Sequence, residues 1–128
     1  MYVITVLLMS TSSRPFCELY VKKILPAIRA YIACVLVKKY NYSQLKASKM
    51  LGIRQPAVNY IVTGKRGVRC IAFIESNPAL KNLIDEYIVE LVASEHFNPC
   101  KICRKIREDA TTLNTILQHL AVFEQFTS

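Results

Sequence analysis

Two cysteines in this sequence share a short motif, Cys100-Lys-Ile-Cys103. A Cys-x-x-Cys pair presents two thiols at a spacing suited to one metal ion, but two ligands do not complete a site. The side chains that could complete it are Cys17, Cys70, His96 and His119. Flanking cations that would stabilise thiolates or an anionic cluster are Lys101, Arg104, Lys105 and Arg107.

Three chemistries remain open for this pair: an iron–sulfur or other redox-sensing centre, a structural zinc site, and a thiol–disulfide switch or ordinary thiols. The remaining cysteine, Cys34, lies in the apolar run AYIACVLV and is expected to be a buried small hydrophobe. The chain has an odd cysteine count and no recognisable secretory signal, and its apolar start, MYVITVLLM, is too short to cross a bilayer. We therefore expect a cytoplasmic protein with no membrane association, in which structural disulfides are rare.

A second group of residues has the chemistry of nucleic-acid recognition, and it lies in SQLKASKMLGIRQPAVNYIVTGKRG, residues 43–67. Gln and Asn bond adenine in the major groove and Arg bonds guanine, so the candidates for reading bases are Arg54, Gln55, Asn59 and Tyr60. Gln44 is placed for a phosphate at the start of a short helix. The cations expected to hold the DNA backbone are Lys46, Lys49, Lys65, Arg66 and Arg69.

The charge distribution supports a polyanionic partner. The net charge is +8, but residues 1–70 carry 12 Lys and Arg and one acid, whereas residues 71–128 carry 5 Lys and Arg and 8 acids. A half of the chain with almost no acid is typical of a nucleic-acid-binding surface.

These residues must be positioned by helices, because the apolar residues recur at helical steps and the chain holds only 3 Gly. Pro26 is expected to separate two helices, 16–24 and 26–40. Two short helices follow, over residues 44–51 and 55–62, with Ser43 as N-cap, Gly52 in the turn, and Pro56 in the first turn of the second. Inward positions are Leu45, Ser48, Leu51, Val58 and Ile61. Two longer helices, 78–95 capped by Asn77 and 112–126, complete the pattern, and their apolar surface suggests a dimer interface.

Two short helices joined at a glycine predict a helix-turn-helix, whose second helix enters the major groove. Residues 43–67 resemble this motif in the lambda repressor-like class. The longer stretch CELYVKKILPAIRAYIACVLVKKYNYSQLKASKMLGIRQPAVNYIVTGKRGVR, together with the later CKICRKIR, resembles a family of small archaeal transcriptional regulators over about residues 16–108. Ser48 stands where Ala is more common, and Arg54 replaces the usual Thr or Ser at the N-cap of the recognition helix.

The resemblance implies sequence-specific binding of double-stranded DNA, as a homodimer on a palindromic site. It also favours Cys17 as the third ligand of a centre with Cys100 and Cys103, with Cys70 as a candidate fourth. Such a thiolate set suits an iron–sulfur cluster, with zinc as the alternative.

The sequence therefore predicts an all-α protein, a lambda repressor-like helix-turn-helix bundle with a C-terminal helical extension. We expect a flexible segment over residues 1–15, where Met9 is an alternative start, a DNA-binding domain over 16–76, and a C-terminal segment over 77–128 for dimerisation or sensing. The alternatives are a structural RNA-binding or zinc-stapled nucleic-acid-binding protein and, less favoured, a thiol redox enzyme. An enzyme is not expected, because the sequence shows no βαβ pattern, phosphate loop or Ser/His/Asp set.

Overall fold

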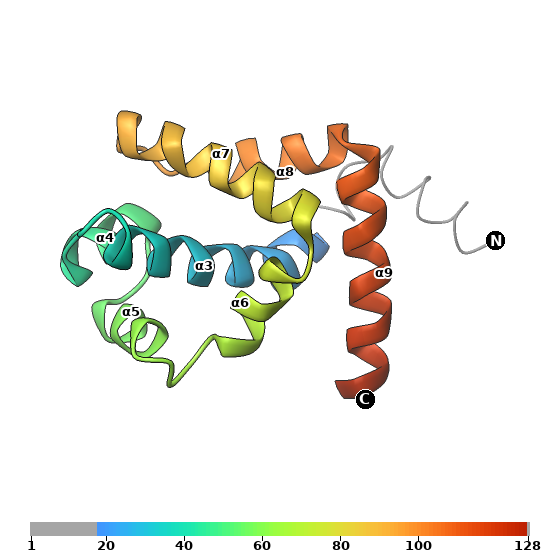
Figure 1. Ribbon diagram of the computed structural model, residues 1–128, viewed down its shortest axis with the longest axis horizontal. Helices are drawn as coiled ribbons and strands as arrows, with labels where there is room; N and C mark the ends of the chain where they lie inside the picture. The colour runs from blue at the N-terminus through green and yellow to red at the C-terminus, as the bar shows by residue number, and fades with distance from the viewer. Residues whose placement is uncertain (1–17, 128) are drawn as a thin grey trace.

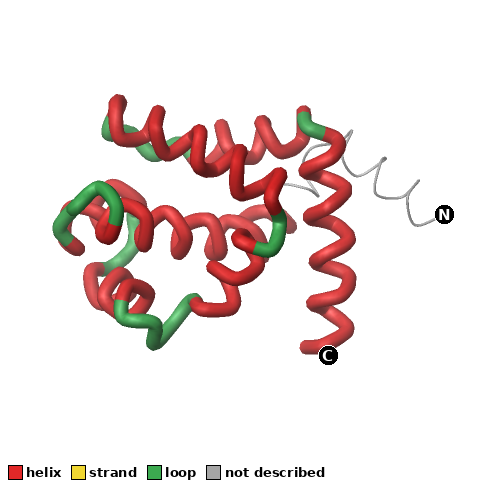
Figure 2. Tube along the Cα trace, in the orientation of Figure 1, coloured by secondary structure: helices red, strands yellow, loops and turns green. Residues whose placement is uncertain are grey.

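The computed structural model describes residues 18–127, with side chains as far as Gln118, and this part of the chain is all-α without a strand (Figures 1 and 2). The expected segment 1–15 and Cys17 lie outside the described residues. The elements, in chain order, are η1 (Tyr20–Ile24), α3 (Leu25–Lys38), α4 (Gln44–Leu51), α5 (Gln55–Val62), α6 (Val68–Glu75), α7 (Pro78–Ser94), α8 (Pro99–Glu108) and α9 (Ala110–Thr127).

Helix α3 lies at the centre, with α7 on one side and α4, α5 and α6 around the other (Figure 1). Its residues explain this place, because apolar side chains occupy nearly every face of the helix. Leu25, Ile28, Ile32 and Leu36 are buried, and Tyr31 is 6% exposed. A helix that is apolar all round is stable only when other helices surround it.

The sequence predicted two helices separated at Pro26, but the helical path does not break there. The five-residue π-helix η1 leads directly into α3, and the Leu25 N–H donates to the Tyr20 carbonyl, five residues back. Proline has no N–H and crowds the carbonyl four residues earlier. The wider π turn lies directly before the proline, so the helical path continues past it.

The two short helices have the bounds that the sequence predicted. Ser43 caps α4 by accepting a hydrogen bond from the Lys46 N–H at 3.0 Å, and Gly52 ends it with φ +70°. Pro56 lies in the first turn of α5. The inward face of α4 differs from the expected one: Ser48 and Leu51 are buried, but Leu45 is 48% exposed. Ala47 takes the inward position in its place, because its small side chain allows α4 to approach the core closely.

Two features between α5 and α7 were not foreseen. Helix α6 follows Gly67, whose φ of +80° reverses the chain after α5. Asn77 stands directly before α7 as expected, but its side chain makes no capping bond. The amide is fully buried, and neither its Nδ2 nor its Oδ1 has a hydrogen-bond partner among the described residues. The backbone of Asn77, at φ −121° and ψ 88°, does not prevent a cap, because Asn98 caps α8 from nearly the same angles. The difference lies in the side chain of Asn77, which is fully buried instead of lying at the exposed helix end.

The C-terminal helices form a second layer over α3. Helix α8, which the sequence did not predict as a helix, returns beside α7, and α9 crosses their end (Figure 1). The division expected at residue 76 falls at the turn between α6 and α7. The buried residues on both sides of it form one cluster, which extends from Tyr20 to Ile116. The two layers therefore share a core.

Candidate nucleic-acid interface and thiol pair

The polar residues of α4 and α5 gather at one end of this helix pair. Arg54, Gln55 and Tyr60 are exposed, with Tyr60 at 45%. Gln44 and Asn59 are half-buried, and the Asn59 Nδ2 donates to the Gln44 Oε1 at 3.2 Å. A shallow hollow of about 280 Å³ is lined by Gln44, Gln55, Pro56, Asn59 and Tyr60. The structure thus brings together three of the four residues expected to read bases, and it adds Gln44, which was expected at a phosphate. The hydrogen bond between Asn59 and Gln44 links the two helices.

Arg54 occupies the N-cap position of α5, with φ −77° and ψ 147°. Its side chain makes no capping bond, and its carbonyl accepts hydrogen bonds from the N–H groups of Ala57 and Val58. Since a guanidinium has donors only, it cannot cap a helix N-terminus. The exposed guanidinium is therefore placed at the leading end of α5, where it can reach an external acceptor.

Five cations lie on or beside this helix pair, are exposed, and have no acidic partner among the described residues: Lys49, Arg54, Lys65, Arg66 and Arg69. The sequence places no acid between Glu18 and Glu75. The N–H groups of Lys65 and Arg66 donate to the Tyr60 carbonyl at 2.9 and 3.1 Å, which folds the basic loop against the end of α5. The cations are therefore on the same part of the molecule as the polar residues of α5.

Lys46 is in a different environment from these cations. Its ammonium lies 3.1 Å from the Glu95 carboxylate and 4.4 Å from the centre of the Tyr42 ring. Glu95 ends α7 in the left-handed conformation, with φ +56°. A phosphate at Lys46 would compete with this carboxylate. The ion pair joins segments far apart in the sequence, so no local pattern could have revealed it.

Of the four cysteines in the described residues, Cys100 and Cys103 share one helix, and the other two lie on separate helices. Cys100 is exposed and Cys103 is buried, and both lie in the first two turns of α8. Cys70 is half-buried on α6, and Cys34 is half-buried on α3, where its thiol donates to the Ile61 carbonyl at 3.7 Å. Burial raises the pKa of the Cys34 thiol.

Within residues 18–118, no group of three or more His, Cys, Asp or Glu side chains could hold a metal ion. Cys70 therefore does not join Cys100 and Cys103 in such a group. His96 is exposed in the loop before α8, and the side chain of His119 and all of Cys17 lie outside the described part. A metal centre on Cys100 and Cys103 would need ligands beyond those that the structure describes.

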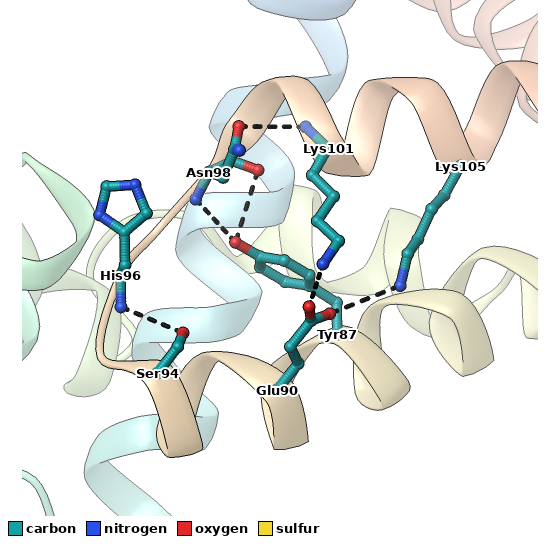
Figure 3. Close-up of polar contacts among 7 residues, drawn as sticks. All are labelled: Tyr87, Glu90, Ser94, His96, Asn98, Lys101 and Lys105. Carbon is teal, nitrogen blue, oxygen red and sulfur yellow. Dashed lines mark hydrogen bonds and ion pairs between the residues drawn. The ribbon is translucent and has the colours of Figure 1, made fainter.

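Two tyrosines hold the turn that precedes Cys100. The Tyr20 hydroxyl donates to the Pro99 carbonyl at 2.9 Å, and the Tyr87 hydroxyl accepts from the Asn98 N–H at 2.7 Å (Figure 3). The Asn98 side chain caps α8 by accepting from the Lys101 N–H. Neither tyrosine was predicted to make a polar contact. Tyr20 lies 79 residues from Pro99, and Tyr87 meets Asn98 only because the chain turns back between α7 and α8.

The surroundings of Tyr20 show how close these groups are. Burial raises the pKa of the Tyr20 hydroxyl far above its usual value, the thiols of Cys103 and Cys100 raise it further, and Arg29 opposes them. On the neighbouring turn, Glu90 of α7 is paired with Lys101 and, at 3.7 Å, with Lys105 (Figure 3). The hydrogen bond from Lys101 is the main reason that the pKa of Glu90 is lowered.

Another group of polar contacts joins α3 to α7. The Tyr31 hydroxyl donates to the Asp85 Oδ1 at 2.5 Å, and the Lys81 ammonium lies 2.9 Å from the Asp85 Oδ2. Burial, followed by the hydrogen bond to Asp85, raises the pKa of Tyr31 to about 12. This contact fixes the two layers to each other, away from the thiols and from α5.

No family model, curated protein or solved structure matches the chain. None of the helices in the described residues combines the length and the apolar character needed to cross a membrane.

Proposed function

We propose that this protein is a sequence-specific regulator of transcription that binds double-stranded DNA through α4 and α5. The observation that carries the proposal is the face built from these two helices. This face, with the loop after α5 and the start of α6, combines the side chains that we propose read bases with five cations that lack an acidic partner in the described structure. Such a face matches the two needs of DNA recognition, which are neutralisation of phosphates and readout of base edges.

In this proposal α5 is the recognition helix and its N-terminal end enters the major groove. Arg54 would bond guanine, and Gln55 and Asn59 would bond adenine. Gln44 lies beside Asn59 at the start of α4, where it would contact a phosphate. The basic loop and the start of α6 would hold the backbone through Lys65, Arg66 and Arg69. We propose a homodimer on a palindromic site, because a single short helix reads few base pairs.

RNA is the alternative partner for a basic helical surface. Single-stranded RNA is usually recognised by stacking bases on exposed aromatic rings. On the α4–α5 face, Tyr60 is the exposed aromatic residue among the described side chains, and the other groups suit a groove rather than splayed bases. Duplex DNA is therefore the better fit.

The test is selection of bound sequences from a random duplex DNA library by the purified full chain, with a single-stranded RNA library in parallel. Enrichment of a duplex motif is the expected result. The control variant Lys22→Gln/Lys23→Gln, in exposed residues of η1, should enrich the same motif, whereas Arg54→Ala should lose preference at one or more positions. Enrichment of RNA alone, or of no sequence in either library, would contradict the proposal.

Control of binding by an iron–sulfur cluster or zinc is a separate proposal. It depends on Cys17, because Cys100 and Cys103 supply two thiols and Cys70 does not join them. A bound metal would cross-link the segment before η1 to α8. Metal and sulfide analysis of protein purified without oxygen, compared with Cys17→Ser, tests this part alone.

A further inference from the structure

Cys100 and Cys103 differ in exposure although they lie on one helix. Cys100 is exposed at the start of α8, and Cys103 is 3% exposed and packs in the core. An exposed thiol can meet a reagent from solution, and a buried neighbour on the same helix can then displace that reagent.

The distance expected between the Cβ atoms of Cys100 and Cys103 on a regular helix is slightly longer than a disulfide allows. Residues three apart on a helix have Cβ atoms about 5–6 Å apart, whereas a disulfide needs about 3.5–4.5 Å. Joining the two sulfurs therefore requires the first turn of α8 to tighten by roughly 1–2 Å. The Pro99 carbonyl precedes this turn directly, and it is the group that accepts the Tyr20 hydrogen bond.

We propose that Cys100 and Cys103 form a reversible disulfide by exchange with a low-molecular-weight disulfide, and that closing it weakens the contact of Tyr20 with Pro99. In the first step the Cys100 sulfur bonds to one sulfur of the reagent, whose S–S bond breaks and releases one thiol. In the second step the Cys103 sulfur bonds to Cys100, and the second reagent thiol leaves with the remaining proton. The two cysteines are oxidised and the reagent disulfide is reduced.

The contact between Tyr20 and Pro99 is connected to α4 and α5 through one continuous helical segment. Tyr20 belongs to η1, which continues without a break into α3, and α3 packs against both α4 and α5. Loss of the Tyr20 hydrogen bond removes one of the contacts that hold the N-terminal end of this shared helix. The inference does not rest on the proposed DNA binding, since it concerns the thiols and the helix that they hold.

The chemistry is tested by equilibrating the full chain with oxidised glutathione, blocking the remaining thiols, and mapping peptides by mass spectrometry. We expect an intrachain bond between Cys100 and Cys103, with loss of two hydrogen atoms. Cys103→Ser should stop at a mixed disulfide on Cys100, and the exposed change Cys100→Ser should give neither product. Cys70→Ser, in a half-buried thiol on another helix, is the matched control and should still form the bond.

Three results would overturn the proposal. One is a pair that stays fully alkylatable after equilibration. Another is an intrachain bond that joins Cys100 to Cys17 instead of to Cys103. Stoichiometric zinc or iron that protects both thiols until a chelator removes it would also contradict the dithiol assignment.

The coupling is tested by hydrogen exchange of the reduced and oxidised protein. We expect exchange of the η1 amides to become about fivefold faster on oxidation, the effect of losing one hydrogen bond. Tyr20→Phe should show fast exchange in both states, whereas Tyr31→Phe, which removes a different bond of the same helix, should keep the difference. Equal exchange at η1 in reduced and oxidised wild-type protein would refute the coupling.

Discussion

Three cations beyond α5 provide the sharpest test of the proposed DNA-binding face. Lys65, Arg66 and Arg69 are exposed, and none has an acidic partner in residues 18–118. Replacing all three with Gln removes their charge and keeps most of their length. Surface changes of this kind usually alter stability by less than about 0.5 kcal/mol each. The variant should therefore fold normally and show an effect on binding alone.

The size of the effect follows from counterion release. If Lys49, Arg54, Lys65, Arg66 and Arg69 each neutralise one phosphate, log K falls with log salt at a slope of about −4.5 per protomer. Raising salt fourfold, from about 50 to about 200 mM, then weakens binding about 500-fold. With two of these cations left, the slope becomes about −1.8 and the loss about 12-fold. The variant should bind weakly at low salt and respond much less to added salt.

The assay is fluorescence anisotropy with a labelled duplex that carries the selected motif, titrated at several salt concentrations. The matched control is Lys22→Gln/Lys23→Gln/Arg104→Gln, which removes the same charge from exposed residues of η1 and α8. These elements lie away from the α4–α5 pair (Figure 1). If the control lowers the slope as much as the test variant does, net charge rather than this face drives binding, and the reasoning is refuted.

Three further outcomes follow from single contacts. Ser43→Ala removes the N-cap of α4 and should lower the free energy of unfolding by about 1 kcal/mol in urea titration. Val58→Ala should lower it by about 2 kcal/mol, because Val58 is fully buried, and should weaken DNA binding in proportion to the unfolded fraction. Tyr31 contributes stability below its unfolded pKa, near 10, and loses it as pH rises through its folded pKa of about 12. Tyr31→Phe should therefore show a weaker loss of stability between these pH values.

The parts of the fold that the sequence predicted are those set by local chemistry. Ser43, Gly52 and Pro56 act through the first or last turn of their own helix, so the bounds of α4 and α5 were confirmed at both ends. The start of α7 at residue 78 is confirmed as well, because Pro78 suits the first turn of a helix, although Asn77 does not cap it as expected. The grouping of Gln44, Gln55 and Asn59 followed from placing these two helices side by side.

The errors concern positions where distant residues decide the outcome. Leu45 fits a helical stripe, but α3 packs against the side of α4 that carries Ala47. Helix α6 is short, and its third residue, Cys70, was considered as a metal ligand, although its apolar neighbours are typical of a helix. The partners of Lys46 and Tyr20 lie on α7 and α8, and no spacing in the sequence connects them.

The C-terminal layer holds the α4–α5 pair through α3 and through the ion pair between Glu95 and Lys46, and this arrangement limits how a signal could act on the pair. Helices of eight residues are not stable alone, so α3 must position both of them. Tyr20 fixes one end of α3 to α8, Tyr31 fixes its middle to α7, and Glu95 ties the end of α7 to α4 itself. A change at Cys100 reaches the first of these contacts only. It should therefore alter the mobility of α3 at its N-terminal end more than the geometry of α5, which makes hydrogen exchange a more sensitive measurement than DNA affinity.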